Sequence, residues 1–447
     1  MSSSDQRLID AVLSEIPPHL RQRPMVLGFS GGLDSTVLLH LLVRARDAGL
    51  LADFKALHVN HQLQPQADAW ARQAQRLADN WRVPFIGVSV DIDRSRPVGL
   101  EAAAREARYA ALAGRMEEGG VLLTAHHLDD QAETFLLQLM RGAGVRGLSA
   151  MPVLMPFDKG WHVRPMLRVR RNQLMEYAET NGLLWVDDPS NADVRYARNH
   201  VRHHILPSMR SHWPQAEETL ARASRRMAST ESLLHDLARL DLDKARTDEL
   251  HVLEAHALLQ LSSERLHNAL RFWLIEMDFP VPPEQRLAEI GNMLRVRPDA
   301  VPMVEWAGVA VYRWRECLYF KRKSQTLVDP GMRVHWDGRA ELVLPALGLR
   351  LVPSLELGMG LRLDLVKAAG LEIRLRSGGE VIRLPRQQHH KEVKHLLQEA
   401  GIPPWERETL PFIYIDNKLA QVGDRWTSAD FQPDNHHEGL VVRMLPL

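Results

Sequence analysis

The stretch Met25-Val-Leu-Gly-Phe-Ser-Gly-Gly-Leu-Asp-Ser-Thr-Val-Leu-Leu-His40 decides the fold class of this chain. Residues 25–29 form an apolar run without polar alternation, which is typical of a parallel strand buried on both faces. The two glycines after Ser30 let the backbone adopt positive φ and approach a ligand closely. Asp34 and Ser35 are both favourable at a helix N-cap, and apolar residues then recur at helical spacing. The pattern predicts a strand, a glycine turn and a helix whose N-terminus can bind phosphate.

Similar turns occur in proteins that bind no phosphate, so the residue types within the turn have to distinguish a phosphate-binding loop from an ordinary strand–helix turn. The chain has no Gly-x-x-x-x-Gly-Lys-[Ser/Thr] sequence, which excludes a Walker-type loop, and the turn lacks the Gly-x-Gly-x-x-Gly of a dinucleotide site. The loop resembles the pyrophosphate-binding loop of the PP-loop ATPases, which cleave ATP between the α- and β-phosphates and transfer AMP to an oxygen. This resemblance implies an ATP-binding loop made of Ser30, Gly31, Gly32, Leu33, Asp34 and Ser35.

The rest of the chain predicts three domains. Strand patterns alternate with helical patterns after the glycine loop, at residues 54–59, 84–90 and 121–125. This alternation predicts an α/β fold, a doubly wound parallel sheet with its site at the carboxyl ends of the strands. A mainly helical middle part follows, and the last part mixes short strands with one helix and is therefore α+β. We place these domains at residues 1–213, 214–330 and 331–447.

The composition is that of a soluble globular protein, with 45% hydrophobic and 25% charged residues. Lys+Arg 56 balance Asp+Glu 56, so a nucleic-acid surface must arise from local segregation of charge. The single cysteine, Cys317, excludes a disulfide framework and a Cys₄ zinc site. Neither a signal peptide nor an apolar run of the ~18 residues that span a membrane is apparent. We expect a cytoplasmic protein without a membrane partner.

A second polar cluster follows the predicted strand at 121–125, in His126-His-Leu-Asp-Asp-Gln-Ala-Glu133. On a helix, His126, Asp130 and Glu133 would lie on one face, at i, i+4 and i+7. Solvated helix surfaces show the same pattern, but this cluster lies just past a strand, where α/β proteins form their sites. Such a group could hold Mg²⁺ through carboxylate oxygens or bind a cationic substrate. It lacks the His-Glu-x-x-His sequence of a zinc protease.

Several motifs, in this order, resemble the tRNA(Ile)-lysidine synthases: the glycine loop, Ala104-Arg-Glu-Ala-Arg-Tyr109, His126 to Glu133, Arg164-Pro165, Asp188-Pro-Ser-Asn191 and Arg198-Asn-His-Val-Arg202. Residues 383–405 are similar to the terminal domain of that family. The resemblance implies a ligase that uses ATP and Mg²⁺ to adenylate O2 of the wobble cytidine, position 34, in the isoleucine tRNA with a CAU anticodon. The amine of free L-lysine then displaces AMP from C2, which gives lysidine and lets the tRNA read AUA as isoleucine.

The resemblance also implies roles for individual residues. Asp34 would orient Mg²⁺ or the reacting α-phosphate, and Asp129 is a second candidate ligand for Mg²⁺. Arg105 would contact the activated intermediate, and His126 would lie beside the adenylated base. The lysine pocket would consist of Asp130, Glu133, Arg198 and Arg202. The catalytic residues are then Asp34, Arg105, His126, Asp130 and Glu133. Members of this family suggest a dimer or a monomer.

Two basic regions are candidate tRNA contacts. Residues 194–215 contain no acidic residue, although a solvated helix end would have the same composition. Residues 374–395 are rich in arginine and lysine and poor in aromatic residues, which favours contact with the backbone of a double-stranded stem. The predicted tRNA-binding residues are Arg195, Arg210, Arg374, Arg376, Arg383, Arg386, Lys391 and Lys394. Trp405, which follows two prolines, is expected to be a packing anchor.

Three other functions are compatible with parts of the pattern. A tRNA thiolase of the PP-loop class ordinarily needs a reactive or cluster-binding cysteine, and Cys317 lies far from the loop in the sequence. A small-molecule ligase would not need the basic C-terminal domain. A non-catalytic RNA-binding module with a relic nucleotide site would release no pyrophosphate from ATP, lysine, Mg²⁺ and tRNA.

Overall fold

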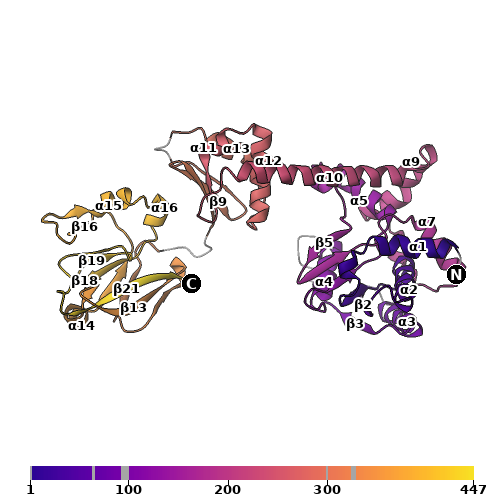
Figure 1. Ribbon diagram of the computed structural model, residues 1–447, viewed down its shortest axis with the longest axis horizontal. Coiled ribbons are helices and arrows are strands. Elements are labelled where there is room, and N and C mark those ends of the chain that lie inside the picture. The colour runs from indigo at the N-terminus through magenta and orange to yellow at the C-terminus, as the bar shows by residue number, and fades with distance from the viewer. Residues whose placement is uncertain (1–2, 63–65, 92–99, 298–300, 324–328) are drawn as a thin grey trace. The chain divides into compact units, whose positions relative to one another are not determined.

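The computed structural model describes residues 3–62, 66–91, 100–297, 301–323 and 329–447 (Figure 1). The chain divides into two compact units, Met1–Leu237 and Ala238–Leu447. Within the described ranges, no helix has the length and apolarity that a membrane crossing requires.

A six-stranded sheet organises the first unit, with the strand order β3-β2-β1-β4-β6-β5. The strands are β1 (Met25–Gly28), β2 (Phe54–Asn60), β3 (Phe85–Ser89), β4 (Val121–Leu123), β5 (Leu154–Phe157) and β6 (Gly160–Val163). The pairings from β3 through to β6 are parallel, and β5 pairs with β6 antiparallel. The predicted doubly wound parallel sheet is confirmed, and its strand order reverses between β1 and β4, where ligands bind in such sheets.

The hairpin of β5 and β6 was not predicted, because Pro152, Pro156 and Pro165 interrupt the local pattern. Pro156 is nevertheless part of β5, opposite Trp161. Since β5 is the edge strand of the sheet, the missing N–H of a proline there costs no hydrogen bond to a further strand.

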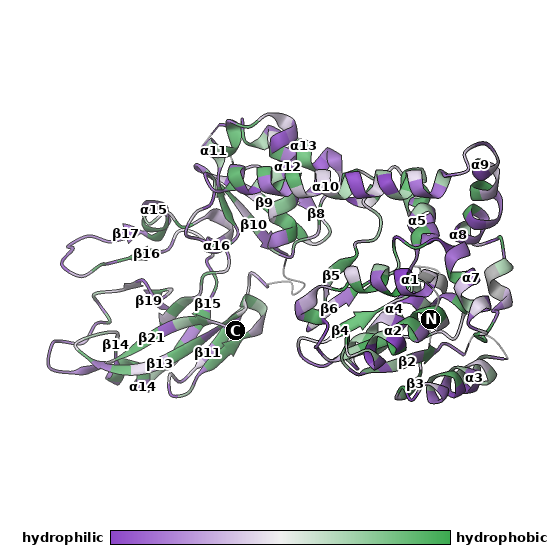
Figure 2. Cartoon of the chain, turned by 45° about the vertical axis from the view of Figure 1, so that its right-hand side comes forward, coloured by the Kyte–Doolittle hydropathy of each residue, from purple (hydrophilic) through white to green (hydrophobic). Residues whose placement is uncertain are grey.

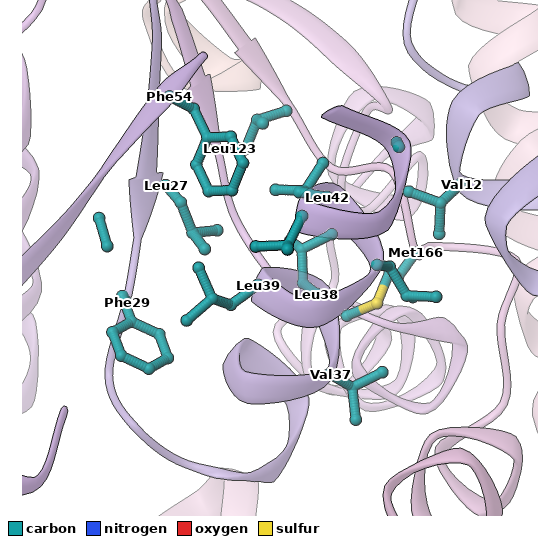
Figure 3. Close-up of a cluster of buried hydrophobic side chains, with 14 of the residues drawn as sticks. Val12, Leu27, Phe29, Val37, Leu38, Leu39, Leu42, Phe54, Leu123 and Met166 are labelled. Carbon is teal, nitrogen blue, oxygen red and sulfur yellow. The ribbon is translucent and has the colours of Figure 1, made fainter. Parts of the chain in front are cut away.

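Helices cover both faces of this sheet: α1 (Ser3–Ser14), α2 (Leu33–Asp47), α3 (Ala67–Asn80), α4 (Leu100–Ala113), α5 (Leu128–Met140), α6 (Val145–Leu148) and α7 (Arg171–Thr180). The main core lies between the sheet and the helices α1, α2, α3 and α7. Figure 3 shows Leu27 of β1 against Leu38, Leu39 and Leu42 of α2. A smaller cluster, with Val26, Leu57 and Leu122, packs on Leu112 of α4 at the opposite face. The two cores hold β1, and the main core holds α2, so the glycine loop that joins them is fixed at both ends.

After this sheet the chain is helical: α8 (Ala197–His200), a π-helical turn (Val201–Ile205), α9 (Leu206–His212) and the long α10 (Ala216–Leu242). Pro207 follows the π-helical turn in the first turn of α9. A proline removes a helical N–H donor, which favours a local change of hydrogen-bond pattern. Figure 2 shows hydrophilic bands recurring along α10, as expected for a helix with much of its surface in solvent.

The second unit begins with a four-stranded antiparallel sheet, in the order β7-β10-β9-β8, and three helices. These elements are β7 (Val252–Glu254), β8 (Met303–Trp306), β9 (Val309–Trp314), β10 (Cys317–Arg322), α11 (Ala255–Leu259), α12 (Ser263–Glu276) and α13 (Glu284–Met293). Helices in the middle region are confirmed, and so is the change to strands at residue 309. The two short strands β7 and β8 complete a sheet that the sequence pattern did not reveal.

The C-terminal part of the second unit holds a five-stranded sheet, β11-β15-β18-β19-β20, and a four-stranded sheet, β12-β13-β21-β14. The five-stranded sheet consists of β11 (Arg333–Trp336), β15 (Leu371–Arg374), β18 (Phe412–Ile415), β19 (Lys418–Val422) and β20 (Trp426–Thr427). The four-stranded sheet consists of β12 (Leu342–Leu344), β14 (Leu361–Arg362) and the long antiparallel pair β13 (Leu349–Leu357) and β21 (Glu438–Pro446). Three short helices, α14 (Leu363–Ala369), α15 (Val393–Glu399) and α16 (Pro404–Arg407), confirm the α+β class. Trp405 of α16 stacks on Tyr312 of β9 with ring centroids 4.3 Å apart, which confirms it as a packing anchor.

The core of the first unit gives a simple stability test. Leu39 is fully buried between α2 and the sheet, whereas Leu50 is 45% exposed. Leu39→Ala should lower the free energy of unfolding by about 2–5 kcal/mol, because it removes buried methyl groups and leaves a cavity. The matched control Leu50→Ala should cost less than about 1 kcal/mol. Urea unfolding of both variants measures this, and equal losses would contradict the packing.

Candidate active site

A cavity of about 1580 Å³ opens at the carboxyl ends of β1, β2 and β4, where the parallel sheet predicted a site. Ser30 and Asp34 of the glycine loop, Arg105 of α4, and Asp130 and Glu133 of α5 all line it. The cavity is larger than the roughly 300–1,000 Å³ of typical small-molecule pockets. It therefore has room for a nucleotide together with a second substrate.

The glycine loop is held by hydrogen bonds within the loop and by one from Val186. Gly31 has φ +82°, a conformation that residues with a Cβ avoid. Its carbonyl oxygen accepts the N–H of Val186 at 2.9 Å, so the segment before the Asp187-Asp188 turn supports the loop. Ser35 Oγ accepts the N–H of Gly31 at 3.1 Å and donates to the carbonyl of Gly32 at 3.1 Å.

The N-cap of α2 is Gly32, so the prediction that Asp34 or Ser35 caps this helix is wrong. The extended conformation of Gly32 starts the helix without a side-chain cap, and Ser35 instead bonds within the loop. Helix geometry leaves the first-turn N–H groups of Leu33, Asp34 and Ser35 without intrahelical acceptors. These donors and the positive end of the helix dipole suit a phosphate.

Asp34 faces His127, which is almost fully buried. The distance from Asp34 Oδ2 to His127 Nε2 is 3.5 Å, and Asp130 Oδ2 lies 3.4 Å from the same nitrogen. Burial lowers the pKa of His127, but Asp130 and Asp34, with help from Asp129, raise it to about 9. An imidazolium therefore links the glycine loop to α5. Since an imidazolium has no acceptor nitrogen, its Nδ1 cannot accept the N–H of Asp130, 3.4 Å away, and the N-cap relies on the backbone N–H of His127, which donates to Asp130 Oδ2 at 3.0 Å.

The two candidate Mg²⁺ ligands differ in what surrounds them. Asp34 Oδ1 is buried without a hydrogen-bond partner, which fits a carboxylate that completes its coordination with a cation. Asp129 Oδ2 accepts the N–H of Arg171 at 2.9 Å, and Asp129 Oδ1 lies 3.9 Å from Arg210. Among the described residues there is no group of three potential ligands for a metal. Mg²⁺ commonly uses one or two carboxylates and completes its shell with substrate phosphates and water, so Asp34 fits this role better than Asp129.

His126 does not belong to the helix that the spacing argument assumed. The helix α5 begins at Leu128 with His127 as N-cap, so the i, i+4, i+7 relation holds for Asp130 and Glu133 but is wrong for His126. Its ring turns back to Thr124 Oγ1, 2.9 Å from Nδ1. His126 still lines the cavity beside Asp130 and Glu133, so the predicted residues are brought together by a different local structure.

Two buried carboxylates of α5 face two arginines from the α8 region. Arg198 donates to Glu133 at 2.7 Å and to Asp130 at 2.8 Å. Arg202, in the π-helical turn, donates to the two oxygens of Glu133 at 2.6 and 3.0 Å and to Asp130 at 3.1 Å. The side chain of Glu133 is 1% exposed, and that of Asp130 is 10% exposed. We call Asp130, Glu133, Arg198 and Arg202 the carboxylate–arginine cluster.

Asp130, Arg198 and Arg202 are charged at neutral pH, and Glu133 is ion-paired with both arginines. Burial raises the pKa of Asp130, but His127 and Arg198 hold it well below its ordinary value. Burial lowers the pKa of Arg198, whereas Asp130 and Glu133 raise it further above the ordinary value. The cluster has no net charge, and its carboxylates have cationic partners before any substrate binds.

The basic run at residues 194–215 is not an uncompensated basic surface. Besides the two arginines of the cluster, Arg195 pairs with Asp193 at 2.6 Å, and Arg210 pairs with Glu217. The partners of Arg198, Arg202 and Arg210 come from outside the run, so the sequence of the run alone overstates its positive charge.

Most predicted tRNA contacts of the C-terminal part are also ion-paired. Arg376 lies 3.9 Å from Glu380, and Lys391 lies 2.6 Å from Glu399. Arg374 and Arg383 pair with Glu372 and Asp430. Of the eight predicted tRNA-binding side chains, all within the described residues, Arg386 and Lys394 are exposed and have no recorded ion pair.

Three polar residues near the cavity, Arg108, His162 and Arg164, received no individual role from the sequence, although Arg108 and Arg164 belong to motifs quoted above. Arg108 lines the cavity one helical turn after Arg105, and both guanidinium groups lie against the ring of Tyr109, 5.0 Å away for Arg105 and 5.6 Å for Arg108. Burial, reinforced by Arg105 and Arg198, lowers the pKa of Arg108, although Tyr109 opposes this. The spacing of Arg105 and Arg108 was the available signal. His162 and Arg164 lie on or next to β6, which the sequence did not predict.

Three ranges of the chain match models of known protein families. Residues 1–209 match the PP-loop domain, residues 253–319 the TilS substrate binding domain, and residues 371–444 the TilS substrate C-terminal domain. The tRNA(Ile)-lysidine synthase of Alkalilimnicola ehrlichii is 40% identical over 407 residues, which are 91% of this chain and 90% of the relative. The chain belongs to the tRNA(Ile)-lysidine synthase family.

Two further tRNA(Ile)-lysidine synthases agree with this assignment. The one from Xanthomonas axonopodis pv. citri is 41% identical, covering 90% of this chain and 89% of the relative. The one from Methylococcus capsulatus is 38% identical, with 94% and 96% covered. The predicted family, the PP-loop ATPase fold of the first domain and the ligase class are confirmed, and a thiolase or a non-catalytic RNA-binding module is excluded.

Gly31 offers a specific test of the loop. Gly31→Ala forces a Cβ onto a residue with φ +82°, which costs roughly 1–2 kcal/mol and shifts the loop N–H groups. Gly49→Ala is a matched control, because Gly49 has φ +72° and no atom within 4 Å of an added Cβ. Gly31→Ala should lower kcat/KM for ATP about ten- to a hundredfold. Gly49→Ala should lower stability alike but keep ATP kinetics, and similar kinetics in both variants would refute the loop assignment.

Proposed function

We propose that this chain performs both steps of lysidine formation in the one cavity. The observation that carries the proposal is that the glycine loop and the carboxylate–arginine cluster line the same cavity, linked by His127. The first element suits the phosphates of ATP, and the second suits a free amino acid. Family membership supports isoleucine tRNA as the polynucleotide substrate.

In the first step, O2 of the wobble cytidine attacks the α-phosphate of ATP. A bond forms between O2 and the α-phosphorus, and pyrophosphate leaves with the bridging oxygen. The first-turn N–H groups of α2 hold the phosphates, and Arg105 and Arg108 offset the negative charge of the intermediate. Mg²⁺, when bound with ATP, would neutralise phosphate charge beside Asp34.

In the second step, the amine of lysine attacks C2. The C2–N bond forms, the C2–O2 bond breaks, AMP departs with the former base oxygen, and the amine nitrogen releases one proton to solvent. The carboxylate–arginine cluster has two negative and two positive groups, which match the α-ammonium and α-carboxylate of free lysine. Binding at that end leaves the side-chain amine free to reach C2.

The two steps can be separated at Asp130. Asp130→Asn removes one negative charge from the cluster and should abolish lysine incorporation while part of the tRNA-dependent ATP–pyrophosphate exchange remains. Glu176→Gln is the matched control, since Glu176 lines the cavity outside the cluster and should leave both activities near wild type. Labelled lysine and labelled pyrophosphate measure the two steps. Equal loss of both in Asp130→Asn would assign this carboxylate to adenylation.

The ion-pair pattern of the C-terminal part predicts which basic residues bind tRNA. Arg386→Ala and Lys394→Ala should weaken tRNA binding, and each should reduce the slope of log K against log salt by about one. Arg374→Ala is the matched control, because Glu372 already pairs with that guanidinium. Filter binding at several salt concentrations measures the slopes. A larger effect for Arg374→Ala than for the other two would contradict the assignment.

A further inference from the structure

A chain of hydrogen bonds leads from Arg164 to the ring of His126. Arg164 Nη2 lies 3.2 Å from His162 Nδ1. On the other side of that ring, His162 Nε2 lies 2.8 Å from Thr124 Oγ1. Thr124 Oγ1 is in turn 2.9 Å from His126 Nδ1. Thr124, His162 and Arg164 are buried, with 8%, 1% and 5% exposed, while the ring of His126 lines the cavity.

The imidazoles of His126 and His162, the two histidines of this hydrogen-bond chain, are neutral. Burial holds the pKa of His162 at about 3, and Arg164 and Arg105 also lower it. Burial likewise holds the pKa of His126 well below its ordinary value, although Asp130 opposes this. A neutral imidazole carries one proton, which leaves one nitrogen as donor and the other as acceptor.

Arg164 determines which atom donates and which accepts at each step of the hydrogen-bond chain. A guanidinium can only donate, so His162 Nδ1 accepts and the proton of His162 is on Nε2. Thr124 Oγ1 then accepts from His162. Among the contacts of the described residues, His126 Nδ1 is the one acceptor within hydrogen-bond distance of this hydroxyl, so the hydroxyl proton is directed to His126 Nδ1. His126 consequently carries its proton on Nε2, the ring nitrogen that takes no part in the hydrogen bond to Thr124.

We propose that Arg164, His162 and Thr124 are positioning residues that hold His126 as a neutral Nε2–H donor to the cytidine O2, and that His126 is not the base for the lysine amine. This inference rests on the proposed function. When the C2–O2 bond breaks, negative charge grows on the oxygen that leaves with AMP. A fixed donor stabilises such charge without reorganisation at the moment of reaction. A nitrogen that already bears a proton cannot accept one from the amine.

The tautomer itself is measurable in the full chain without substrate. Histidine-selective ¹³C and ¹⁵N labelling gives ring signals, and His126→Asn identifies the signal of His126 by its loss. The expected wild-type spectrum shows His126 protonated on Nε2. Thr124→Val, which removes the hydroxyl at nearly constant shape, should give a mixture of tautomers, and Thr124→Ser should restore the single form. A wild-type His126 protonated on Nδ1 would overturn the proposal.

Kinetics test the consequence for the reaction. Thr124→Val should lower kcat for lysidine formation about ten- to a hundredfold, with KM for lysine and tRNA unchanged, and Thr124→Ser should recover most of the rate. If Thr124→Val does not fold, the pair His162→Leu and His162→Gln serves, since glutamine offers an acceptor and a donor in the same order. A wild-type rate in Thr124→Val or in His162→Leu would overturn the proposal. Absence of lysidine with the wild-type chain would instead refute the proposed function, while the tautomer measurement would still stand.

Discussion

The active site depends on two buried carboxylates that are neutralised by two arginines. Asp130 and Glu133 could not remain ionised in the interior alone, because an unpaired buried charge costs several kcal/mol. Arg198 and Arg202 remove that cost and tie α5 to the α8 region, across 65 to 72 residues of sequence. Removing either carboxylate leaves two guanidinium groups against one carboxylate, so the cluster is a structural tie and, in the proposed function, also the element that recognises lysine. Its mixed charge is what distinguishes this cavity from a simple nucleotide pocket.

The parallel sheet places the glycine loop beside this cluster. The loop follows β1 and the cluster follows β4, and these strands are neighbours where the strand order reverses. His127 lies between Asp34 and Asp130, so a single imidazolium connects the glycine loop to the carboxylate–arginine cluster. In the proposed function, this architecture brings ATP, base and lysine to one edge of the sheet.

The features that sequence could predict are those written in local patterns. The apolar strand, the Gly31-Gly32 turn and the following helix are determined within 20 residues, and strand–helix alternation places Asp34 and Asp130 at the same edge. Ion pairs between distant segments leave no local signature, so only the family resemblance grouped Arg198 and Arg202 with the carboxylates of α5, and the partner of Arg383 could not be predicted. His126 was misplaced for a different reason. His127, an unusual N-cap, starts α5 later than the polar spacing suggested. The hydrogen-bond chain from Arg164 to His126 depends on β6, which was not predicted because prolines interrupt the sequence pattern around it.

The central claim is that the glycine loop directs the α-phosphate of ATP to an oxygen of the tRNA base. Its most direct measurement uses isoleucine tRNA with ¹⁸O at O2 of the wobble cytidine, together with ATP, lysine and the wild-type chain. Mass spectrometry of the products then follows the label. We expect AMP to carry the ¹⁸O and pyrophosphate to carry none. Unlabelled AMP alongside lysidine, or ¹⁸O in pyrophosphate, would contradict it.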